Sequence, residues 1–105
     1  MTTMRLEAGK NGGKLSVQVR IPTVFRKYTD QQGVVEVDPG TLASVVDQLE
    51  GRYPGIKGQL LNGDGQFHRF VNVYVNDEDV RYLKKLDTKA DDGDEVSLLP
   101  SVAGG

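Results

Sequence analysis

The strongest constraint on the fold is a strict alternation of apolar and polar side chains in two separate stretches. Between Lys14 and Pro22 every second residue is apolar: Leu15, Val17, Val19 and Ile21. The stretch HRFVNVYVN at 68–76 repeats the pattern with three valines. Side chains of a β-strand point alternately to its two faces, so each stretch predicts a strand with one buried face. Pro22 is predicted to end the first of them.

Two further β-rich runs extend the predicted sheet. Val34–Val37 follows Gln32-Gly33, and residues 23–32 are enough for a hairpin loop. The first two strands are therefore predicted to be antiparallel neighbours. A tight turn at 91–94 leads into the last predicted strand, Glu95–Leu99, which Pro100 is expected to end.

One amphipathic helix is predicted between the strands. Asp38-Pro39-Gly40 breaks the second strand, and Thr41 is the predicted helix N-cap. The apolar residues that follow recur at the spacing of one helical face: Leu42, Val45, Val46, Leu49 and Tyr53. Pro54-Gly55 is predicted to end the helix. Residues 56–66 are expected to be irregular with a turn at 62–65, and residues 80–86 to form a short strand or one helical turn.

This order of elements predicts an α+β fold, with a sheet of four to five strands packed on one main helix. The core is predicted to join the helix face to the inward side chains of the strands: Val17, Val19, Val71, Val73, Val75, Val96 and Leu98. A chain of 105 residues is expected to hold a single core. We divide it into a flexible leader at 1–13, a domain at 14–99 and an extended tail at 100–105.

The composition excludes several kinds of catalytic site. The chain has no cysteine, which excludes disulfides, thiolate metal sites and cysteine nucleophiles. Its single histidine, His68, is interpreted as a structural or surface residue. The carboxylates at 77–79 and 91–95 lie in Asp/Gly turns and are interpreted as solvated turn residues, so no metal site is predicted.

Charge and hydropathy favour a location in the cytoplasm and partners other than nucleic acid or membrane. The 13 basic and 15 acidic residues leave a formal charge of −2, without a basic block of the kind that neutralises phosphates. No apolar run approaches the roughly 20 residues of a membrane span. Residues 1–14 also lack the apolar region of a signal peptide.

The C-terminal stretch LLPSVAGG is the most unusual feature of the sequence. Fully extended, the six residues from Pro100 span at most about 20 Å, so the tail can reach into a partner's cleft. The two terminal glycines carry no side chains and adopt any backbone conformation that a narrow channel demands. Chance is the alternative: with 13 glycines among 105 residues, such an ending arises in about 1.5% of chains. The tail therefore becomes informative only in combination with the fold.

Four stretches carry a resemblance to a known family: VRIPTVFRKYT at 19–29, PGTLASVVDQLEGRYPGI at 39–56, HRFVNVYVNDEDVR at 68–81 and DGDEVSLLPSVAGG at 92–105. Together they resemble the ubiquitin-like sulfur carriers of the ThiS/MoaD family. The resemblance runs from about Leu15 to Gly105 and is most specific in the last two stretches. Within the family the chain looks most like the CysO-type carriers of thiocarboxylate-dependent cysteine biosynthesis. The resemblance implies a ubiquitin-like β-grasp fold.

The resemblance also implies that the carboxylate of Gly105 is the site of the chemistry. In that family an E1-like enzyme uses Mg-ATP to adenylate the C-terminal carboxylate, and a sulfur source converts it to a thiocarboxylate. Gly104 would let this end pass into partner sites. A PLP-dependent cysteine synthase would take up the sulfur, and a metalloprotease would release the cysteine. The carrier itself is expected to bind no cofactor, to be no enzyme and to be monomeric when alone.

Docking to such partners requires an exposed surface beside the tail. Phe70 and Tyr74 are predicted to point away from the helix, and Leu99 has the equivalent orientation on the last strand. In the alternative interpretation, the two aromatic rings cap a second small core beneath residues 56–66. The predicted partner-binding residues combine this surface with the tail: Phe70, Tyr74, Leu99, Pro100, Val102 and Ala103.

Three other functions remain open at this point. The first is the small sulfur-carrying subunit of a molybdopterin synthase, which uses the same thiocarboxylate. The second is a ubiquitin-like modifier whose Gly105 forms isopeptide bonds with lysines. The third is an interaction domain in which the terminal glycines have no role.

Overall fold

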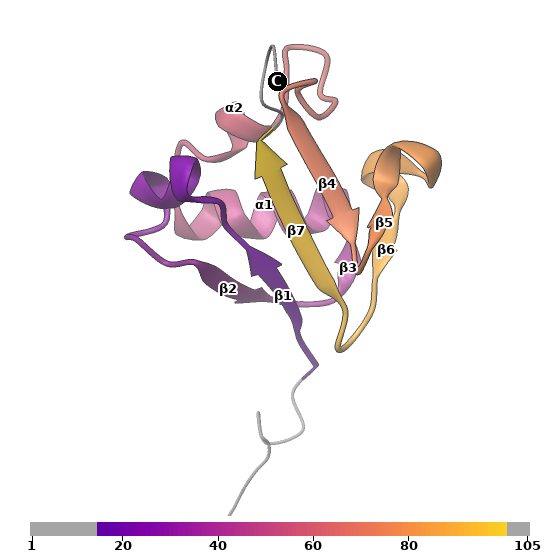
Figure 1. The fold of residues 1–105 in the computed structure, drawn as a ribbon. Coiled ribbons are helices and arrows are strands. Elements are labelled where there is room, and N and C mark those ends of the chain that lie inside the picture. The colour runs from indigo at the N-terminus through magenta and orange to yellow at the C-terminus, as the bar shows by residue number, and fades with distance from the viewer. Residues whose placement is uncertain (1–14, 101–105) are drawn as a thin grey trace, which may run out of the picture.

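The structure, a computed structural model, describes residues 15–100, which build one mixed sheet with a helix across one face (Figure 1). Its strands, in spatial order, are β2 (Val34–Val37), β1 (Val17–Arg20), β7 (Glu95–Pro100), β4 (Val71–Val75) and β5 (Glu78–Asp79). β1 and β7 are parallel, and the other neighbours are antiparallel. The predicted α+β class and the sheet of four to five strands on one main helix are confirmed.

The first two strands form the predicted antiparallel pair, in which Val17 aligns with Val37. Their connection contains the 3-10 helix η1 (Thr23–Tyr28). Thr29 follows η1 and is fully buried, and its hydroxyl donates to the carbonyl oxygen of Gln32 at 2.9 Å. A buried hydroxyl needs such a partner, so this bond holds the return of the chain into β2.

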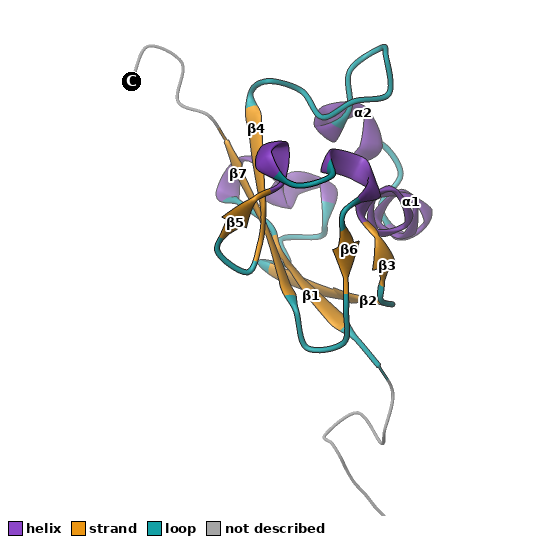
Figure 2. Cartoon of the chain, turned by 90° about the vertical axis from the view of Figure 1, so that its right-hand side faces the viewer, coloured by secondary structure: helices purple, strands orange, loops and turns teal. Residues whose placement is uncertain are grey.

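The helix α1 (Leu42–Arg52) forms where the apolar periodicity predicts it. The hydroxyl of Thr41 accepts a hydrogen bond from the backbone N–H of Ser44 at 3.2 Å, which caps the helix start as predicted. Tyr53 follows the last turn and packs half-buried against the core. The other residues of the predicted face are buried: Leu42, Val45, Val46 and Leu49. In Figure 2, α1 is seen along its axis with the sheet to one side.

The core lies between α1 and the inner face of the sheet. The strand residues predicted for it are all at most 7% exposed: Val17, Val19, Val71, Val73, Val75, Val96 and Leu98. A two-stranded ribbon, β3 (Gly40–Thr41) with β6 (Lys89–Ala90), lies beside the helix start, and Leu42 N donates to Thr88 O there at 2.9 Å. Burial of apolar area contributes about 25 cal/mol per Å². The core between α1 and the sheet is therefore the main source of stability.

The segment 56–66 is more regular than predicted, because it contains the short helix α2 (Lys57–Leu60). The Glu50 carboxylate accepts hydrogen bonds from the backbone N–H groups of Lys57 at 2.9 Å and of Gly55 at 3.1 Å. These two bonds hold the pKa of Glu50 below its usual value. The prediction missed α2 because a side chain of α1, and no local pattern, organises its start. Two apolar residues of the segment are fully buried: Ile56 and Leu60.

Three strand limits differ from the predictions. β1 begins at Val17, and Leu15 is exposed instead of continuing the buried face. β4 begins at Val71 and not at His68, since Val71 N donates to His68 O at 2.9 Å in a preceding turn. β7 ends at Pro100 and not at Leu99, because Pro100 still pairs with Val71 of β4. Proline lacks the N–H donor but keeps its carbonyl acceptor, so the last position of a strand tolerates it.

Residues 80–86 are helical, which is one of the two predicted alternatives. They form two 3-10 turns, η2 (Val80–Tyr82) and η3 (Lys85–Asp87). The Asp79 carboxylate caps η2 by accepting from Arg81 N at 2.9 Å, and it also binds the Arg81 guanidinium, with Nη2–Oδ2 at 2.7 Å. The guanidinium holds the pKa of Asp79 below its usual range. This local ion pair fixes the chain where it leaves the sheet.

Candidate docking surface around the last strand

The last strand has a central place in the sheet. β7 lies between β1 and β4, and it aligns with β4 over its whole register from Val96 to Pro100 (Figure 1). Leu98 points into the core and is only 3% exposed. Any segment that follows Pro100 is therefore attached to a strand that is paired on both sides. Val102, Ala103, Gly104 and Gly105, which were predicted as site residues, lie outside the described residues.

Two of the predicted partner-binding side chains are exposed close to the end of β7. Leu99 is 47% exposed on the outer face of the sheet, where it aligns with Asn72 of β4. Phe70, which directly precedes β4, is 55% exposed. Tyr74 aligns with Ser97, one step further from the strand end, and is half-buried. The structure thus brings Phe70 and Leu99 to the same end of the sheet and places Tyr74 nearer its middle.

The environment of Phe70 differs from that of a core residue. Its ring stacks on His68 with 6.2 Å between ring centroids, and the Arg69 guanidinium lies 5.8 Å from the ring centroid. The aromatic residue that packs against the core from this segment is Phe67, which forms an isolated bridge with Leu61. Phe70 is therefore available at the surface.

Two valines that the sequence analysis did not single out lie at the same end of the sheet. Val34 opens β2 and is 44% exposed, and it aligns with Arg20 at the end of β1. Val24 of η1 is 55% exposed. Because β1 runs parallel to β7, the residues that follow β1 lie at the end where β7 finishes. We call Val24, Val34, Phe70 and Leu99 the tail-end surface. Val34 was detectable from the sequence, because it alternates out of phase with the buried Val35 and Val37.

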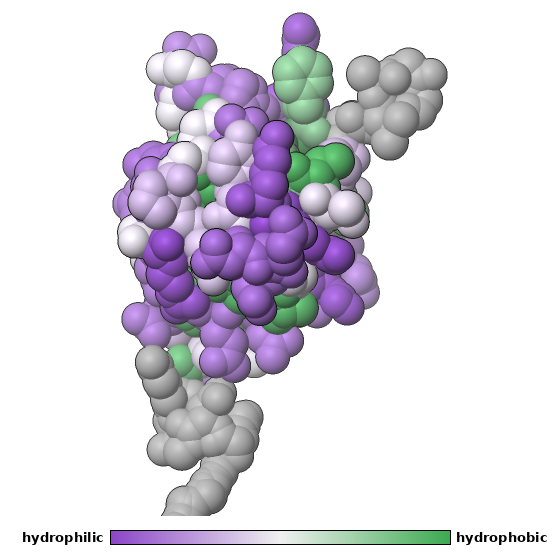
Figure 3. Space-filling model, turned by 90° about the vertical axis from the view of Figure 1, so that its left-hand side faces the viewer, coloured by the Kyte–Doolittle hydropathy of each residue, from purple (hydrophilic) through white to green (hydrophobic). Residues whose placement is uncertain are grey.

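The space-filling view shows how apolar groups are distributed on one side of the molecule. In Figure 3 most of this side is covered by polar side chains, and apolar side chains gather toward its upper right. Single exposed apolar residues are common on protein surfaces, whereas several at one end mark an interaction site. The concentration at one end favours docking of a partner there.

The two arginines near this end make contacts within the chain. Arg20 Nε lies 3.0 Å from Glu95 Oε2, across the β1–β7 pair, with both side chains well exposed. Arg26 Nε donates to Ile21 O at 3.0 Å and so supports the turn after β1. Their first role is thus to hold the local structure, and an exposed pair such as Arg20–Glu95 contributes little to stability.

The acidic residues of the described part of the chain are the candidates for a metal site. Within residues 15–100, no group of three or more His, Asp or Glu side chains is placed to hold a metal ion. The acidic turns satisfy backbone and amide donors instead: Asp92 Oδ1 accepts from Ser16 N at 2.9 Å, and Asp94 Oδ1 accepts from Asn76 Nδ2 at 3.2 Å. In the same part of the chain, no helix is long and apolar enough to cross a membrane. These side chains hold turns in place, and the outer face offers contacts for a partner.

Comparison with known proteins bears on this arrangement. The sequence pattern of the ThiS family matches residues 19–105. The sulfur carrier protein CysO of Mycobacterium tuberculosis is 47% identical over 93 residues, which cover 87% of this chain and all of that protein. The small archaeal modifier protein 3 of Haloferax volcanii is 36% identical over 93 residues, with 87% of this chain and all of that protein covered.

Solved structures agree with the fold and with the family. The crystal structure of an Amycolatopsis orientalis BexX/CysO complex contains a chain with a TM-score of 0.79 and 45% identity, covering 85% of this chain and 99% of that one. The ubiquitin-like β-grasp expected from the sequence is therefore confirmed. A β-grasp sheet whose central strand leads to the C-terminal segment, together with these matches, shows that the chain belongs to the ThiS family and is a sulfur carrier protein without catalytic activity of its own.

Proposed function

We propose that this carrier holds sulfur as a thiocarboxylate on Gly105 and delivers it for cysteine biosynthesis. The observation that carries the proposal is the position of β7: the strand that leads to the Gly-Gly end is central in the sheet, and exposed apolar side chains lie at the end of the sheet where it finishes. The similarity to CysO over 87% of the chain supports the choice of pathway. The cytoplasm stays the predicted location.

Activation of the terminal carboxylate is the first step of the proposed chemistry. A carboxylate acylates poorly because oxide is a poor leaving group. An E1-like enzyme, using Mg-ATP, would let a carboxylate oxygen of Gly105 attack the α-phosphate, with release of pyrophosphate. Sulfide would then attack the glycyl-adenylate and displace AMP, whereas a persulfide would first form an acyl disulfide, from which a thiol reductant releases the carrier. The product is a thiocarboxylate, which is ionised at neutral pH and ready to act as a sulfur nucleophile.

Delivery of the sulfur is the second step. A PLP-dependent cysteine synthase would accept the thiocarboxylate sulfur, and an S-to-N acyl shift would leave cysteine amide-linked to Gly105. A metalloprotease would hydrolyse that amide and restore the Gly-Gly end. No side chain of the carrier takes part, which agrees with the absence of cysteine from the chain. PLP, ATP and the metal ion all belong to partner enzymes.

Recognition by the partners is assigned to the tail-end surface and the tail itself. Phe70 and Leu99 offer apolar area at the point where the chain leaves the sheet, and Tyr74 extends the same outer face. Pro100, Val102 and Ala103 would line the partner's channel, and Gly104 would pass its narrowest part. A rigid strand that leads directly into the tail lowers the entropic cost of presenting it.

Mass spectrometry of the intact protein tests the proposal. After incubation with the cognate E1-like enzyme, Mg-ATP and sulfide, the chain should gain the mass of one oxygen-to-sulfur exchange, located at Gly105. A variant with one alanine added after Gly105 is the matched control and should stay unmodified. Sulfur incorporation into this blocked variant would contradict the proposed site.

The sulfur acceptor is tested separately. With the cysteine synthase, the thiocarboxylate form should yield a chain that carries one cysteine. Sulfur transfer to a pterin precursor would instead favour the molybdopterin synthase alternative. The similarity to an archaeal modifier protein keeps conjugation as the second candidate, and Gly-Gly remnants on lysines in cell extracts would reveal it.

A further inference from the structure

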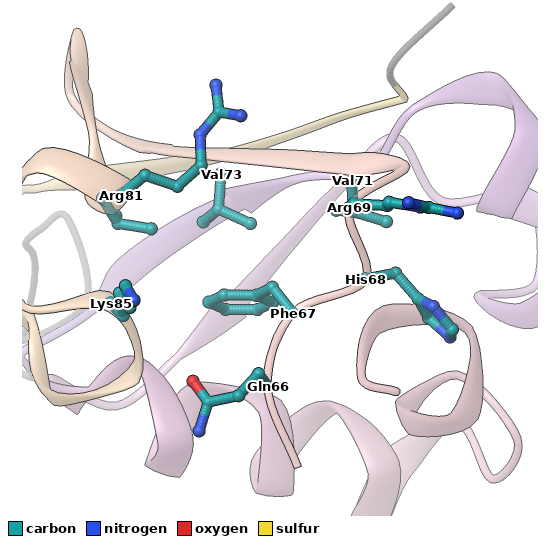
Figure 4. Close-up of a pocket in the computed structure, with 9 residues that line it drawn as sticks. Gln66, Phe67, His68, Arg69, Val71, Val73, Arg81 and Lys85 are labelled. Atoms are coloured by element: carbon teal, nitrogen blue, oxygen red, sulfur yellow. The ribbon is translucent and has the colours of Figure 1, made fainter. Parts of the chain in front are cut away.

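A pocket of about 280 Å³ opens on the inner side of β4, on the opposite face of the sheet from Leu99. It lies between the segment that precedes β4 and the turns η2 and η3, and four apolar side chains form its floor: Phe67, Val71, Val73 and Val80. Figure 4 shows Lys85 across the pocket from Phe67, with Val73 above them and Gln66 below. The cavity thus combines an apolar interior with a basic side chain at its edge.

The charge around the pocket is one-sided. Of the described residues that line it, none is acidic, although the chain carries two more acidic than basic residues. Asp79 lies beside the pocket and already binds Arg81 with Nη2–Oδ2 at 2.7 Å. The Arg69 guanidinium lies over the Phe70 ring, and Figure 4 shows it directed away from the pocket. Within residues 15–100, no carboxylate pairs with Lys85, so its positive charge is available to a ligand.

The backbone at Lys85 adds a second observation. Its φ is 52°, which lies in the left-handed region that glycine, asparagine and aspartate occupy far more readily than lysine. Such strained positions gather at binding sites, where the side chain is needed despite the backbone cost. The structure accepts this strain at the residue whose ammonium group borders the pocket.

We propose that this pocket binds an acidic peptide segment of a partner protein, with one apolar side chain inserted over Phe67 and Val73 and a neighbouring carboxylate paired with Lys85. The volume is slightly below the roughly 300–1,000 Å³ of typical small-molecule sites, so it suits one side chain better than a cofactor. Val71 lines the pocket and aligns with Pro100, so the pocket adjoins the end of β7 on the opposite face of the sheet from Leu99. Its lining residues His68 and Arg69 contact Phe70, so a partner seated in the pocket lies beside the tail-end surface, and this site does not depend on the sulfur chemistry.

Peptide titration with two matched variants tests the site. The probe is a labelled Glu-Asp-Phe-Asp-Glu peptide, measured by fluorescence anisotropy at low salt, with amide chemical shifts to locate the contact. We expect saturable binding with shifts at Phe67, Val73 and Lys85. Lys85→Asn should weaken the affinity about two- to fivefold, as expected for an exposed ion pair, without lowering Tm, because asparagine tolerates the left-handed backbone. Lys84→Asn has the same net charge but alters a lysine outside this pocket, and it should bind the peptide normally.

Two further probes cover the alternatives. A Lys-Lys-Phe-Lys-Lys peptide and a peptide with serine in place of phenylalanine should both fail to bind. Equal weakening by Lys84→Asn and Lys85→Asn, or equal binding of the basic peptide, would overturn the proposal. Tighter peptide binding after removal of residues 101–105 would also overturn it, because the chain's own tail would then be the occupant. None of these results depends on whether Gly105 carries sulfur.

Discussion

Two parts of the molecule are stabilised in different ways. The layered part consists of α1 and the inner face of the sheet, and buried apolar side chains hold it together. The connecting part, residues 53–70 and 76–94, adds core side chains such as Ile56 and Leu60, and its turns are held by side chains that bond to backbone groups. Asn62 is typical, since its Oδ1 accepts from Asp64 N at 2.8 Å and from Gln66 N at 3.2 Å. Apolar burial in the layered part therefore determines the fold, whereas hydrogen bonds in the connecting part determine the shape of the surfaces beside the tail.

The largest effect is expected in the layered part. Leu49 of α1 is 1% exposed, and Leu49→Ala should lower the free energy of unfolding by about 2–5 kcal/mol, because it removes buried area and leaves a cavity. Urea denaturation measures this value. Leu83→Ala, at a residue that is 40% exposed in the connecting part, is the control and should change it by less than about 1 kcal/mol. Equal losses in the two variants would remove the distinction between the two parts.

The next effect concerns the buried hydroxyl of Thr29. Thr29→Val keeps the side-chain shape but removes the hydrogen bond to Gln32 O, and we expect a loss of about 1–2 kcal/mol. Thr29→Ser retains the hydroxyl and should lose less. Thermal unfolding measures the stability of the two variants. Equal stability of the valine and the serine variant would show that the hydrogen bond to Gln32 O contributes nothing.

An effect on docking without an effect on stability is expected at the tail-end surface. Phe70→Ala should slow thiocarboxylate formation by the E1-like enzyme about tenfold at limiting carrier concentration, because aromatic anchors often contribute more than 1 kcal/mol to binding. Since Phe70 is 55% exposed, Tm should hardly change. Tyr82→Ala, which alters an aromatic residue that is 84% exposed in η2, is the matched control. Equal slowing by both variants would argue against a specific role of Phe70.

The smallest effect is a dependence on pH in the connecting part. The hydrogen bonds from Lys57 N and Gly55 N lower the pKa of Glu50 in the folded state below its ordinary value of 4.5. The stabilisation is therefore fully present above the unfolded pKa and is lost as pH falls through the lower folded pKa. Wild type should exceed Glu50→Gln in stability at pH 7, and the difference should vanish in strong acid. Glu36→Gln, on exposed β2, is the control for general charge effects.

How much of the structure the sequence predicts differs between the layered part and the connecting part. The alternation around Val17 and Val73 and the helical spacing of Leu42 to Leu49 are local signals, and they predict β1, β4 and α1 correctly. The start of helix α2 is held by hydrogen bonds from Gly55 N and Lys57 N to the Glu50 carboxylate of α1. Because this contact joins two separate elements, no periodicity in the sequence predicts α2. A resemblance that runs from about Leu15 to Gly105 predicts the family, which the matches confirm.

The tail-end surface is only partly predictable for a related reason. Exposure of Phe70 and Leu99 follows from strand alternation, although β4 itself begins at Val71. That Val24 and Val34 reach the same end depends on the parallel pairing of β1 with β7, which joins distant parts of the chain. The pocket beside Lys85 is assembled in the same way from two connections, and its shape cannot be read from either alone.

The central position of β7 has a consequence for synthesis of the protein. Val19 of β1 and Val73 of β4 both find their neighbour in β7, so an elongating chain lacks the middle of its sheet until residues 95–100 are available. Pairing between segments so far apart in sequence forms slowly, because a long loop must close first. A chain that stops before β7 leaves two unpaired edges, and we expect it not to fold. The topology thus couples folding of the domain to completion of the strand that leads to the tail.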